Sequence, residues 1–564
     1  MKELLIQNGI VYDPLNGVKG ERMDLAARNG KVVPNVLETR AKRIDASGML
    51  VMPGGVDIHT HVAGSEVNTG RLIRPEDHYK DFEKRTSVTR SGVGHSVPST
   101  FTTGYRYARM GYTTIMNPSM PPLEAKHTHE ELNDIPIVDK ATYPLVGDWW
   151  FALEYLRQGD IKGLAKHIAW LIQATKGYAL KIVNPGGPEA WGSGSNVHSL
   201  DDQIPNFCVT PRDIVRGLCK ANKLLNLPHT IHLHTNNLGV PGNYATTLET
   251  MKAVEDLAGD NKPAIHITHC QFSAFKGDDW RTLESGAEEI SNYVNSHSHV
   301  TLDMGQVTFS HTTTMTADGP FQYNLYNLTG NKWANQDVET ETGAGIVPFH
   351  YRRRNYVHAT QWSIGIEFAL LIKDPWKIFL TTDHPNAGPF TSYPRIIAWL
   401  VSKRAREATM KRINPRARSH SLLGSIDREL RFDEIAVMTR AGQAKALGLK
   451  EKGHLGIGAD ADIAIYRINP LDVDPSIEYK AVRKAFRNAA YTIKGGEIVS
   501  RNGEIKKHCE GATLWADVRT REPCEIGEDM KSRFRQYWTV EYENYSVSDE
   551  HLICSKPVTV EANV

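Results

Sequence analysis

Two histidines, separated by one residue, are the first side chains whose spacing suggests chemistry. His59 and His61 follow the apolar stretch 51–58, which contains a Pro-Gly-Gly sequence. Residues two apart on a β-strand point to the same face, so both imidazoles can reach one point at the strand end. Neutral imidazole is the commonest metal ligand, and two on one face make half of a zinc site. Taken alone, the pair is equally compatible with two polar residues that end a buried strand.

Other residues with ligand chemistry also end apolar segments: Lys181, His232, His234, His266, His269 and Asp383. In a barrel of parallel strands the chemistry lies at the C-terminal ends of the strands. His232 and His234 share a face, and we expect the ligand to be His234, which is nearer the strand end. His266 and His269 are three residues apart and face opposite sides, so we expect His269 to be a ligand and His266 to be structural.

Lys181 has two possible roles. A lysine in an apolar strand often only extends its amine to an edge. If it is buried, its pKa falls and it loses its charge. A neutral amine reacts with carbon dioxide to form a carbamate, which is an anionic ligand able to bridge two metals.

Together these residues predict a binuclear metal centre. One ion is expected on the first-strand histidines and the aspartate, and the second on two later histidines: His59, His61 and Asp383; His234 and His269. Carboxylated Lys181 is expected to bridge them. Two metals with a bridging hydroxide supply a nucleophile at neutral pH and polarise a carbonyl. Asp383 can also accept a proton.

Eight apolar segments are typical of strands that would position these residues: 50–58, 112–117, 143–147, 178–184, 229–235, 264–269, 300–304 and 378–383. Helical patterns fall between them: 161–175, 211–225, 244–258 and 361–372. Eight strands alternating with helices indicate a closed (β/α)8 barrel with a parallel sheet. The long insertions 63–111 and 305–377 are expected to be functional, since loops of this length usually are.

Both chain ends have a β-like pattern and flank the predicted barrel. Residues 1–50 and 450–510 contain alternating strands with Gly- and Asn-rich turns, so we expect them to build one small β-sandwich domain. The barrel then occupies residues 51–449. Residues 511–564 form an aromatic-rich extension that we expect not to join the barrel. It would pack on the small domain or on another subunit.

Composition excludes several classes of function. The chain has 564 residues, of which 40% are hydrophobic and 23% charged, with a net charge of +1. This gives no general attraction to nucleic acid or membrane. The six cysteines form no CxxC pair, so neither a disulfide framework nor an iron–sulfur site on this chain alone is expected. There is no signal-peptide or transmembrane pattern, and we expect a cytoplasmic protein.

The order of the candidate ligands is similar to that of the amidohydrolase superfamily. Five segments more specifically resemble the family of formylmethanofuran dehydrogenase A subunits: residues 53–65, 181–187, 231–243, 351–362 and 381–390. The resemblance spans nearly the whole chain and is weakest after residue 510. Hydantoinases and dihydroorotases have an acidic residue two positions after the strand-five histidine, where this chain has Asn236. That departure argues against either activity.

The resemblance implies a specific reaction. In that family, other subunits carry a molybdenum or tungsten pterin and iron–sulfur clusters and reduce carbon dioxide to formate. The family member itself condenses formate with the primary amine of methanofuran at a binuclear zinc site, and the reverse reaction hydrolyses a formamide. For this chain the resemblance implies two zinc ions, an N6-carboxylated Lys181, Asp383 as the proton-transferring catalytic residue, and the other subunits as partners.

Methanofuran carries an acidic tail, so cationic residues are expected near the pocket. Arg352, Arg353 and Arg354 are candidates, although a solvated loop or a subunit contact explains them equally. Asn184 and Asn236, at strand ends, are candidates for substrate hydrogen bonds or for turn capping.

Three other functions stay open at this point. One is the hydrolase subunit of a bacterial formyltransferase/hydrolase complex, which shares the ligand pattern. Another is a free-standing amidohydrolase of the D-aminoacylase or hydantoinase type. The third is a scaffold that keeps the fold without metals, although all six candidate ligands are present.

Overall fold

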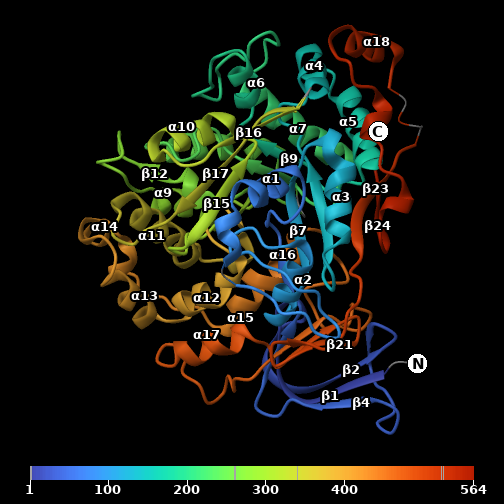
Figure 1. Cartoon of the computed structure of the whole chain (residues 1–564), viewed down its shortest axis with the longest axis vertical. Coiled ribbons are helices and arrows are strands. Elements are labelled where there is room, and N and C mark those ends of the chain that lie inside the picture. Colours follow the sequence, from blue (N-terminus) through green and yellow to red (C-terminus); the bar gives the residue numbers. More distant parts are fainter. Residues whose placement is uncertain (1–2, 80, 260–261, 339–340, 522–523, 525) are drawn as a thin grey trace.

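Strands from both chain ends form a single nine-stranded sheet at one pole of the molecule (Figure 1). The computed structural model describes residues 3–79, 81–259, 262–338, 341–521, 524 and 526–564. The sheet contains β1 (Glu3–Asp13), β2 (Val18–Arg28), β3 (Lys31–Val33), β4 (Lys42–Asp45), β5 (Leu50–Pro53), β19 (Ile463–Tyr466), β20 (Tyr491–Lys494), β21 (Glu497–Arg501) and β22 (Glu504–Ile505). β5 joins the two halves, because it pairs parallel with β1 and antiparallel with β19. It also crosses the predicted domain limit at residue 50, and the domain limits as a whole stay a prediction.

Eight parallel strands form the barrel, in chain order: β6 (Gly55–Asp57), β7 (Tyr112–Met120), β8 (Asp139–Pro144), β9 (Lys181–Val183), β10 (Ile231–His234), β11 (Ile265–Ile267), β14 (Val300–Asp303) and β18 (Ile378–Phe379). The strands lie in two parallel sheets, β6-β7-β8 and β9-β10-β11-β14-β18. Parallel bridges from Leu145 to Lys181 and from Thr60 to His384 connect the two sheets at both edges. The predicted fold class, a barrel with a small β domain built from both chain ends, is confirmed.

The barrel helices follow the predicted patterns, with differences at their ends. α5 (Ile161–Thr175) and α7 (Pro211–Leu225) match the predicted ranges. Thr210 and Asp213 form a capping box at the start of α7, and Pro211 occupies its first turn. α8 (Tyr244–Lys252) is shorter than predicted, and α11 (Tyr356–Leu371) begins earlier because it is buried on all sides and shows no amphipathic period. Within the described part of the chain, no helix is both long enough and apolar enough to cross a membrane.

The two long insertions fold over the barrel. The first contains α1 (Ser65–Ile73) and α2 (Thr100–Arg109). The second contains α10 (Gly319–Thr329) and a three-stranded antiparallel sheet of β15 (His311–Thr316), β17 (Glu341–His350) and β16 (Ala334–Val338). Val67 and Val97 of the first insertion pack with Met315 and Ile346 of the second. The two insertions therefore form one joint cover.

The predicted third strand, residues 143–147, is wrong in its limits. The strand is β8 (Asp139–Pro144), and residues 145–147 already belong to the loop that leaves it. The strand begins with the charged residues Asp139 and Lys140, which are both buried. Asp139 is neutralised by Lys452 and, at 2.8 Å, by Lys494, both from the C-terminal part of the small domain. A strand that buries charge through distant partners lacks the apolar pattern by which a strand is recognised.

The expectation that residues 511–564 stay off the barrel is wrong. β23 (Thr513–Arg519) pairs in parallel with β8 and with β24 (Ser555–Glu561), so the tail extends the sheet of the first three barrel strands. α18 (Glu528–Tyr537) then covers α4 (Trp150–Gln158) (Figure 1). The ring of Phe534 on α18 lies 4.4 Å from that of Phe151 on α4. The tail aromatics therefore pack on the barrel of their own chain.

Candidate metal centre

The turn that carries the first two histidines is held by a buried carboxylate. Asp57, at the end of β6, accepts hydrogen bonds from the backbone N–H of His59 at 3.1 Å and the hydroxyl of Tyr107 at 2.7 Å. The hydroxyl of Tyr393 donates to the same carboxylate. Burial raises the pKa of Asp57 to about 7, against these hydrogen bonds. A side chain two residues before His59 thus sets the direction in which His59 leaves the strand.

Three predicted ligands from three strand ends converge. His59, His269 and Asp383 bring one ligand atom each to within 4.8 Å of one another, and all three are buried. His59 Nε2 lies 2.9 Å and His61 Nε2 3.3 Å from Asp383 Oδ1. Burial alone would raise the pKa of Asp383, but His269 and His59 hold it well below its ordinary value. The carboxylate is therefore charged and lies between imidazoles.

This donor set fits a divalent metal ion of the zinc type. His269 Nδ1 is buried and has no hydrogen-bond partner among the described residues, which is costly unless a ligand takes its lone pair. Imidazole nitrogens together with a carboxylate oxygen are the ligands that zinc prefers. The fit therefore rests on the type, the burial and the convergence of the donor atoms.

A chain of hydrogen bonds leads away from the centre through three histidines. His59 Nδ1 lies 2.9 Å from His232 Nε2, His232 Nδ1 lies 3.1 Å from His229 Nε2, and His229 Nδ1 lies 2.7 Å from the carbonyl oxygen of Ala446. A carbonyl only accepts, and burial lowers the pKa of His232 and His229 so that both rings are neutral. Each Nδ1 must then carry the proton, which leaves His59 Nε2 free for a metal. His232, His59 and Asp303 are also within ligand reach of one another, but both nitrogens of His232 are engaged in this chain.

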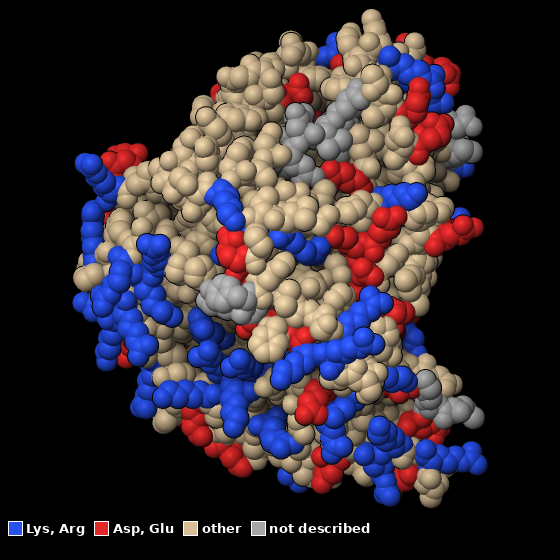
Figure 2. Space-filling view, in the orientation of Figure 1, with Lys and Arg blue, Asp and Glu red and all other residues tan. Residues whose placement is uncertain are grey.

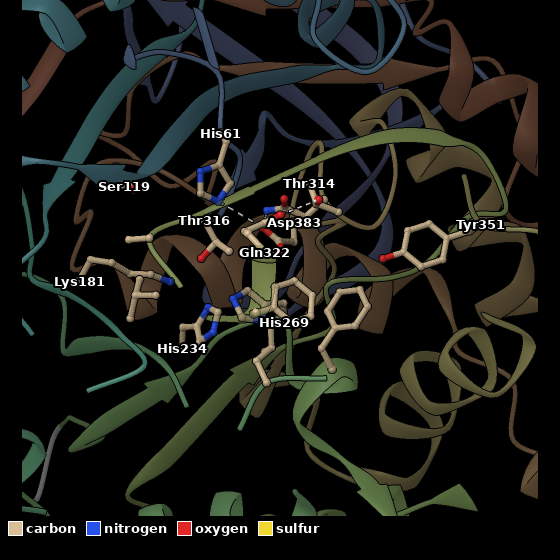
Figure 3. A pocket seen from close by; sticks show the side chains of 16 residues that line it. His61, Ser119, Lys181, His234, His269, Thr314, Thr316, Gln322, Tyr351 and Asp383 are labelled. Carbon is tan, nitrogen blue, oxygen red and sulfur yellow. Dashed lines mark hydrogen bonds and ion pairs between the residues drawn. The ribbon is translucent and has the colours of Figure 1, made fainter. Parts of the chain in front are cut away.

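Lys181 and His234 face the same space as His61 and Asp383 (Figure 3). Lys181 Nζ donates a hydrogen bond to Thr268 Oγ1 at 3.3 Å, and burial lowers the pKa of Lys181 to about 8. His234 Nε2 lies 3.2 Å from Asp318 Oδ2, which orients the ring and leaves Nδ1 available. The rings of His234 and His269 are 4.8 Å apart.

His266 supports the centre indirectly. Its Nε2 lies 3.1 Å from Asp303 Oδ2, and its Nδ1 lies 2.9 Å from Thr301 Oγ1. The other oxygen of Asp303 accepts the backbone N–H of His269 at 3.0 Å. His266 therefore helps to place the backbone of His269 and lies below the cavity.

The cavity at the centre is small. Its volume is about 30 Å³, which is close to the space of one water molecule. Four residues of the second insertion line it opposite the strand ends (Figure 3): Thr314, Thr316, Gln322 and Tyr351. The insertion thus closes the barrel mouth over the candidate ligands.

Three strand-end residues at the site have a left-handed backbone. Asn184, His269 and Asp383 have φ values of 43°, 37° and 46°. For residues with a side chain this conformation costs roughly 1–2 kcal/mol each. Such strain persists where the surrounding structure imposes it, and here it turns two candidate ligands into the cavity.

The predicted substrate-binding residues lie outside the cavity lining. Asn236 Nδ2 donates to Asn184 Oδ1 at 2.9 Å, and Asn184 Nδ2 donates to Asp318 Oδ1 at 3.1 Å, so the two asparagines support His234 through Asp318. Arg352 and Arg354 are exposed. Their role in substrate binding stays a prediction.

Arg353 lines a separate, cationic groove of about 550 Å³. Arg395 on α12 (Tyr393–Val401) and Arg483 on α17 (Tyr479–Arg487) line the same groove. Lys and Arg side chains gather on the face that carries α17 and α13 (Lys403–Met410) (Figure 2). The cationic surface is therefore a feature distinct from the metal cavity.

Several residues of the site were missed by the sequence analysis. Asp318, Gln322 and Tyr351 belong to the second insertion, and Glu66 to the first. The length of the insertions was the one signal for them, because none stands in a recognisable spacing. His229 was missed because its role depends on a partner in the last barrel helix.

The sequence and structure both match known proteins. The amidohydrolase family model matches residues 42–500. Protein FwdA of Methanocaldococcus jannaschii is 52% identical and covers 99% of both chains. The corresponding component of the formyltransferase/hydrolase complex Fhc of Methylorubrum extorquens is 36% identical over 94% of this chain and 93% of its own. The crystal structure of the FhcABCD complex from M. extorquens with methylofuran matches with a TM-score of 0.89 and 33% identity, covering 99% of both chains.

These matches confirm the resemblance and the expectation of a metal-dependent, amidohydrolase-type enzyme. The agreement extends beyond the barrel, since it includes the tail that sequence reasoning placed least securely. The chain belongs to the amidohydrolase family.

Proposed function

We propose that this chain condenses formate with the primary amine of a methanofuran-type cofactor and, in reverse, hydrolyses the resulting formamide. In this proposal it is the amidohydrolase-type component of a formylmethanofuran dehydrogenase complex. Other subunits, with a molybdenum or tungsten pterin and iron–sulfur clusters, supply the formate. The relatedness to FwdA and to a component of a complex solved with methylofuran supports this assignment. The cytoplasmic location stays a prediction.

The observation that carries the proposal is the size of the cavity at the converging ligands. About 30 Å³ beside His269 and Asp383 has room for a one-carbon unit. Hydantoinases and dihydroorotases act on cyclic substrates, whose ring atoms would need more space at the same point. A free-standing enzyme of that type is therefore the weaker alternative.

The proposed ligand arrangement is the binuclear one. His59, His61 and Asp383 would hold one zinc ion and His234 with His269 the other. Lys181, carboxylated on Nζ, would bridge them, and its position in the cavity lining supports this. When bound, such a pair supplies Lewis acidity toward the formyl oxygen and an activated water.

The residues of this chain have clear tasks in the condensation. A substrate ammonium and formate become a formamide and water: the C–N bond forms, one C–O bond breaks, and two protons move from nitrogen to the departing oxygen. Asp383 is placed to carry them, because its Oδ1 lies between His59 and His61 and accepts a hydrogen bond from Asn386 Nδ2 at 2.9 Å. Tyr351 and Gln322 exclude bulk water from the cavity, which favours condensation over the reverse reaction.

The second candidate is the hydrolase subunit of a formyltransferase/hydrolase complex, and the structural match to FhcABCD favours it specifically. The chemistry at this chain would be the same. The two differ in partner subunits, so affinity purification of the native complex and metal analysis of its partners separates them. Molybdenum or tungsten in the complex supports the first candidate, and a complex without either supports the second.

The activity is tested with the full-length chain loaded with zinc. We expect hydrolysis of N-formylfurfurylamine and no comparable hydrolysis of dihydroorotate or hydantoin. We also expect two zinc ions per chain. Faster turnover of the cyclic substrates than of the formamide would refute the proposal.

A further inference from the structure

A second cavity adjoins the metal centre. It has a volume of about 80 Å³ and lies between the loops that follow β7, β8 and β9. It shares Val183 and Ala317 with the metal cavity. At the junction, Glu66 Oε2 lies 3.9 Å from Nδ1 of the candidate ligand His61. A group bound in this second cavity is therefore next to the reaction site.

The walls of this cavity are acidic and aromatic. Three carboxyl groups and three indoles line it: Glu66, Asp148 and Glu189; Trp149, Trp150 and Trp538. None of the described residues in the lining is Lys or Arg. Carboxylates gathered in a poorly hydrated space without a cation are costly, and burial together with neighbouring Glu189 raises the pKa of Asp148 well above its ordinary value.

Buried polar atoms here also lack partners. Glu66 is 4% exposed, and its Oε1 has no hydrogen-bond partner among the described residues. The same is true of the indole nitrogens of Trp149 and Trp538. A native structure rarely leaves such atoms unsatisfied unless a ligand or water meets them. The unsatisfied groups include an acceptor and two donors beside flat aromatic surfaces.

We propose that this cavity binds the amine half of the substrate, namely a primary ammonium attached to a flat aromatic ring. The carboxylates face the ammonium, and the indoles pack against the ring. The assignment rests on the proposed function and deepens it. A desolvated ammonium gains from carboxylate pairing and from aromatic faces, and the ring gains from apolar burial.

The same charges determine which substrate enters here. Formate is an anion and is repelled by three acidic side chains, so it must reach the metal centre by another side. The amine nitrogen, directed through the junction at Val183, then meets formate at the metal cavity. The site thereby separates the two substrates by charge before they react.

The inference also assigns a role to the C-terminal tail. Trp538 directly follows α18, and Phe534 of that helix is buried against Phe151. The tail therefore supplies one wall of a substrate cavity in its own chain. Its packing on the barrel is a condition for that wall.

The probe is furfurylamine, with furfuryl alcohol as its uncharged counterpart. Calorimetric titration into the full-length, zinc-loaded chain is expected to show tighter binding of the amine by about tenfold or more. Asp148→Asn and Glu189→Gln are expected each to weaken amine binding by about tenfold and to leave alcohol binding within about twofold. Glu130→Gln, on the exposed side of α3 (Ala125–Asn133), is the matched control and should change neither.

A second readout uses the amine as product inhibitor of N-formylfurfurylamine hydrolysis. Its inhibition constant should rise in both charge variants, with the formate inhibition constant unchanged. Equal binding of amine and alcohol, or loss of amine and formate affinity together, would overturn the assignment. If the wild-type chain binds the amine in a charge-dependent manner but hydrolyses no formamide, the proposed function fails and this cavity assignment stands.

Discussion

Replacing His232 by phenylalanine tests the hydrogen-bond chain beneath the metal centre. The change removes the acceptor that lies 2.9 Å from His59 Nδ1 and keeps a ring of similar size among buried neighbours. His59 then has no partner to hold its proton on Nδ1, so the tautomer that leaves Nε2 free is no longer favoured. Loss of such a supporting partner typically lowers metal affinity about 10–100-fold, or roughly 1.4–2.7 kcal/mol. The orphaned N–H costs a further 1–3 kcal/mol or so of folding stability.

The assay is a zinc titration of the metal-free, full-length chain against a competing chelator. His229→Phe leaves the His59–His232 bond in place and loosens only the next one, so a smaller loss is expected. His167→Phe is the matched control. His167 is a buried histidine whose ring lies 4.4 Å from Phe151, and neither of its nitrogens has a hydrogen-bond partner among the described residues. It should bind zinc like the wild type.

The reasoning is refuted if His232→Phe and His167→Phe bind zinc with the same affinity as the wild type. It is also refuted if both variants lose affinity equally, because the effect would then come from loss of a buried histidine in general. Near-ultraviolet circular dichroism shows whether each variant remains folded.

Three further predictions concern other parts of the molecule. Lys181→Ala should lower zinc content below the wild-type level and formamide hydrolysis by about a hundredfold or more; retention of both metals and of activity would exclude Lys181 as a bridge. Burial alone would raise the pKa of Asp139, but Lys452 holds it below its ordinary value, so the stabilisation is complete above pH about 4 and is lost as pH falls below that. Urea unfolding at several pH values checks this, and stability that does not fall below pH 4 would contradict it. Phe534→Ala, which removes a fully buried ring, should cost about 3–5 kcal/mol in urea unfolding, whereas Tyr537→Ala, 63% exposed on the same helix, should cost little; equal effects would show that the tail is not packed on the barrel.

The barrel and the candidate ligands were accessible from local patterns. Alternating apolar segments and helices are short-range features, and α5 and α7 match the predicted ranges for that reason. The choice of His234 over His232 also followed from strand position. The structure places the ring of His234 in the cavity lining and that of His232 in the chain to His59.

The features that were missed or wrong depend on distant partners. β8 begins with Asp139, which is buried only because lysines of the small domain neutralise it. The tail joins the barrel through β23, whose pairing partner lies in a different part of the sequence. No local pattern carries either fact. Likewise, Tyr351 and Asp318 stand in an insertion whose residues have no regular spacing.

The sequence by itself determined which atoms can bind a metal and the order in which strands present them, because both follow from residue type and a two-residue period. The tertiary structure decided which nitrogen of His59 is free and which residues close the cavity. A neutral imidazole carries its one proton where a partner accepts it, and the partners of His59 form a chain that ends at the carbonyl of Ala446. That arrangement exists only when the strands and the last barrel helix are packed together.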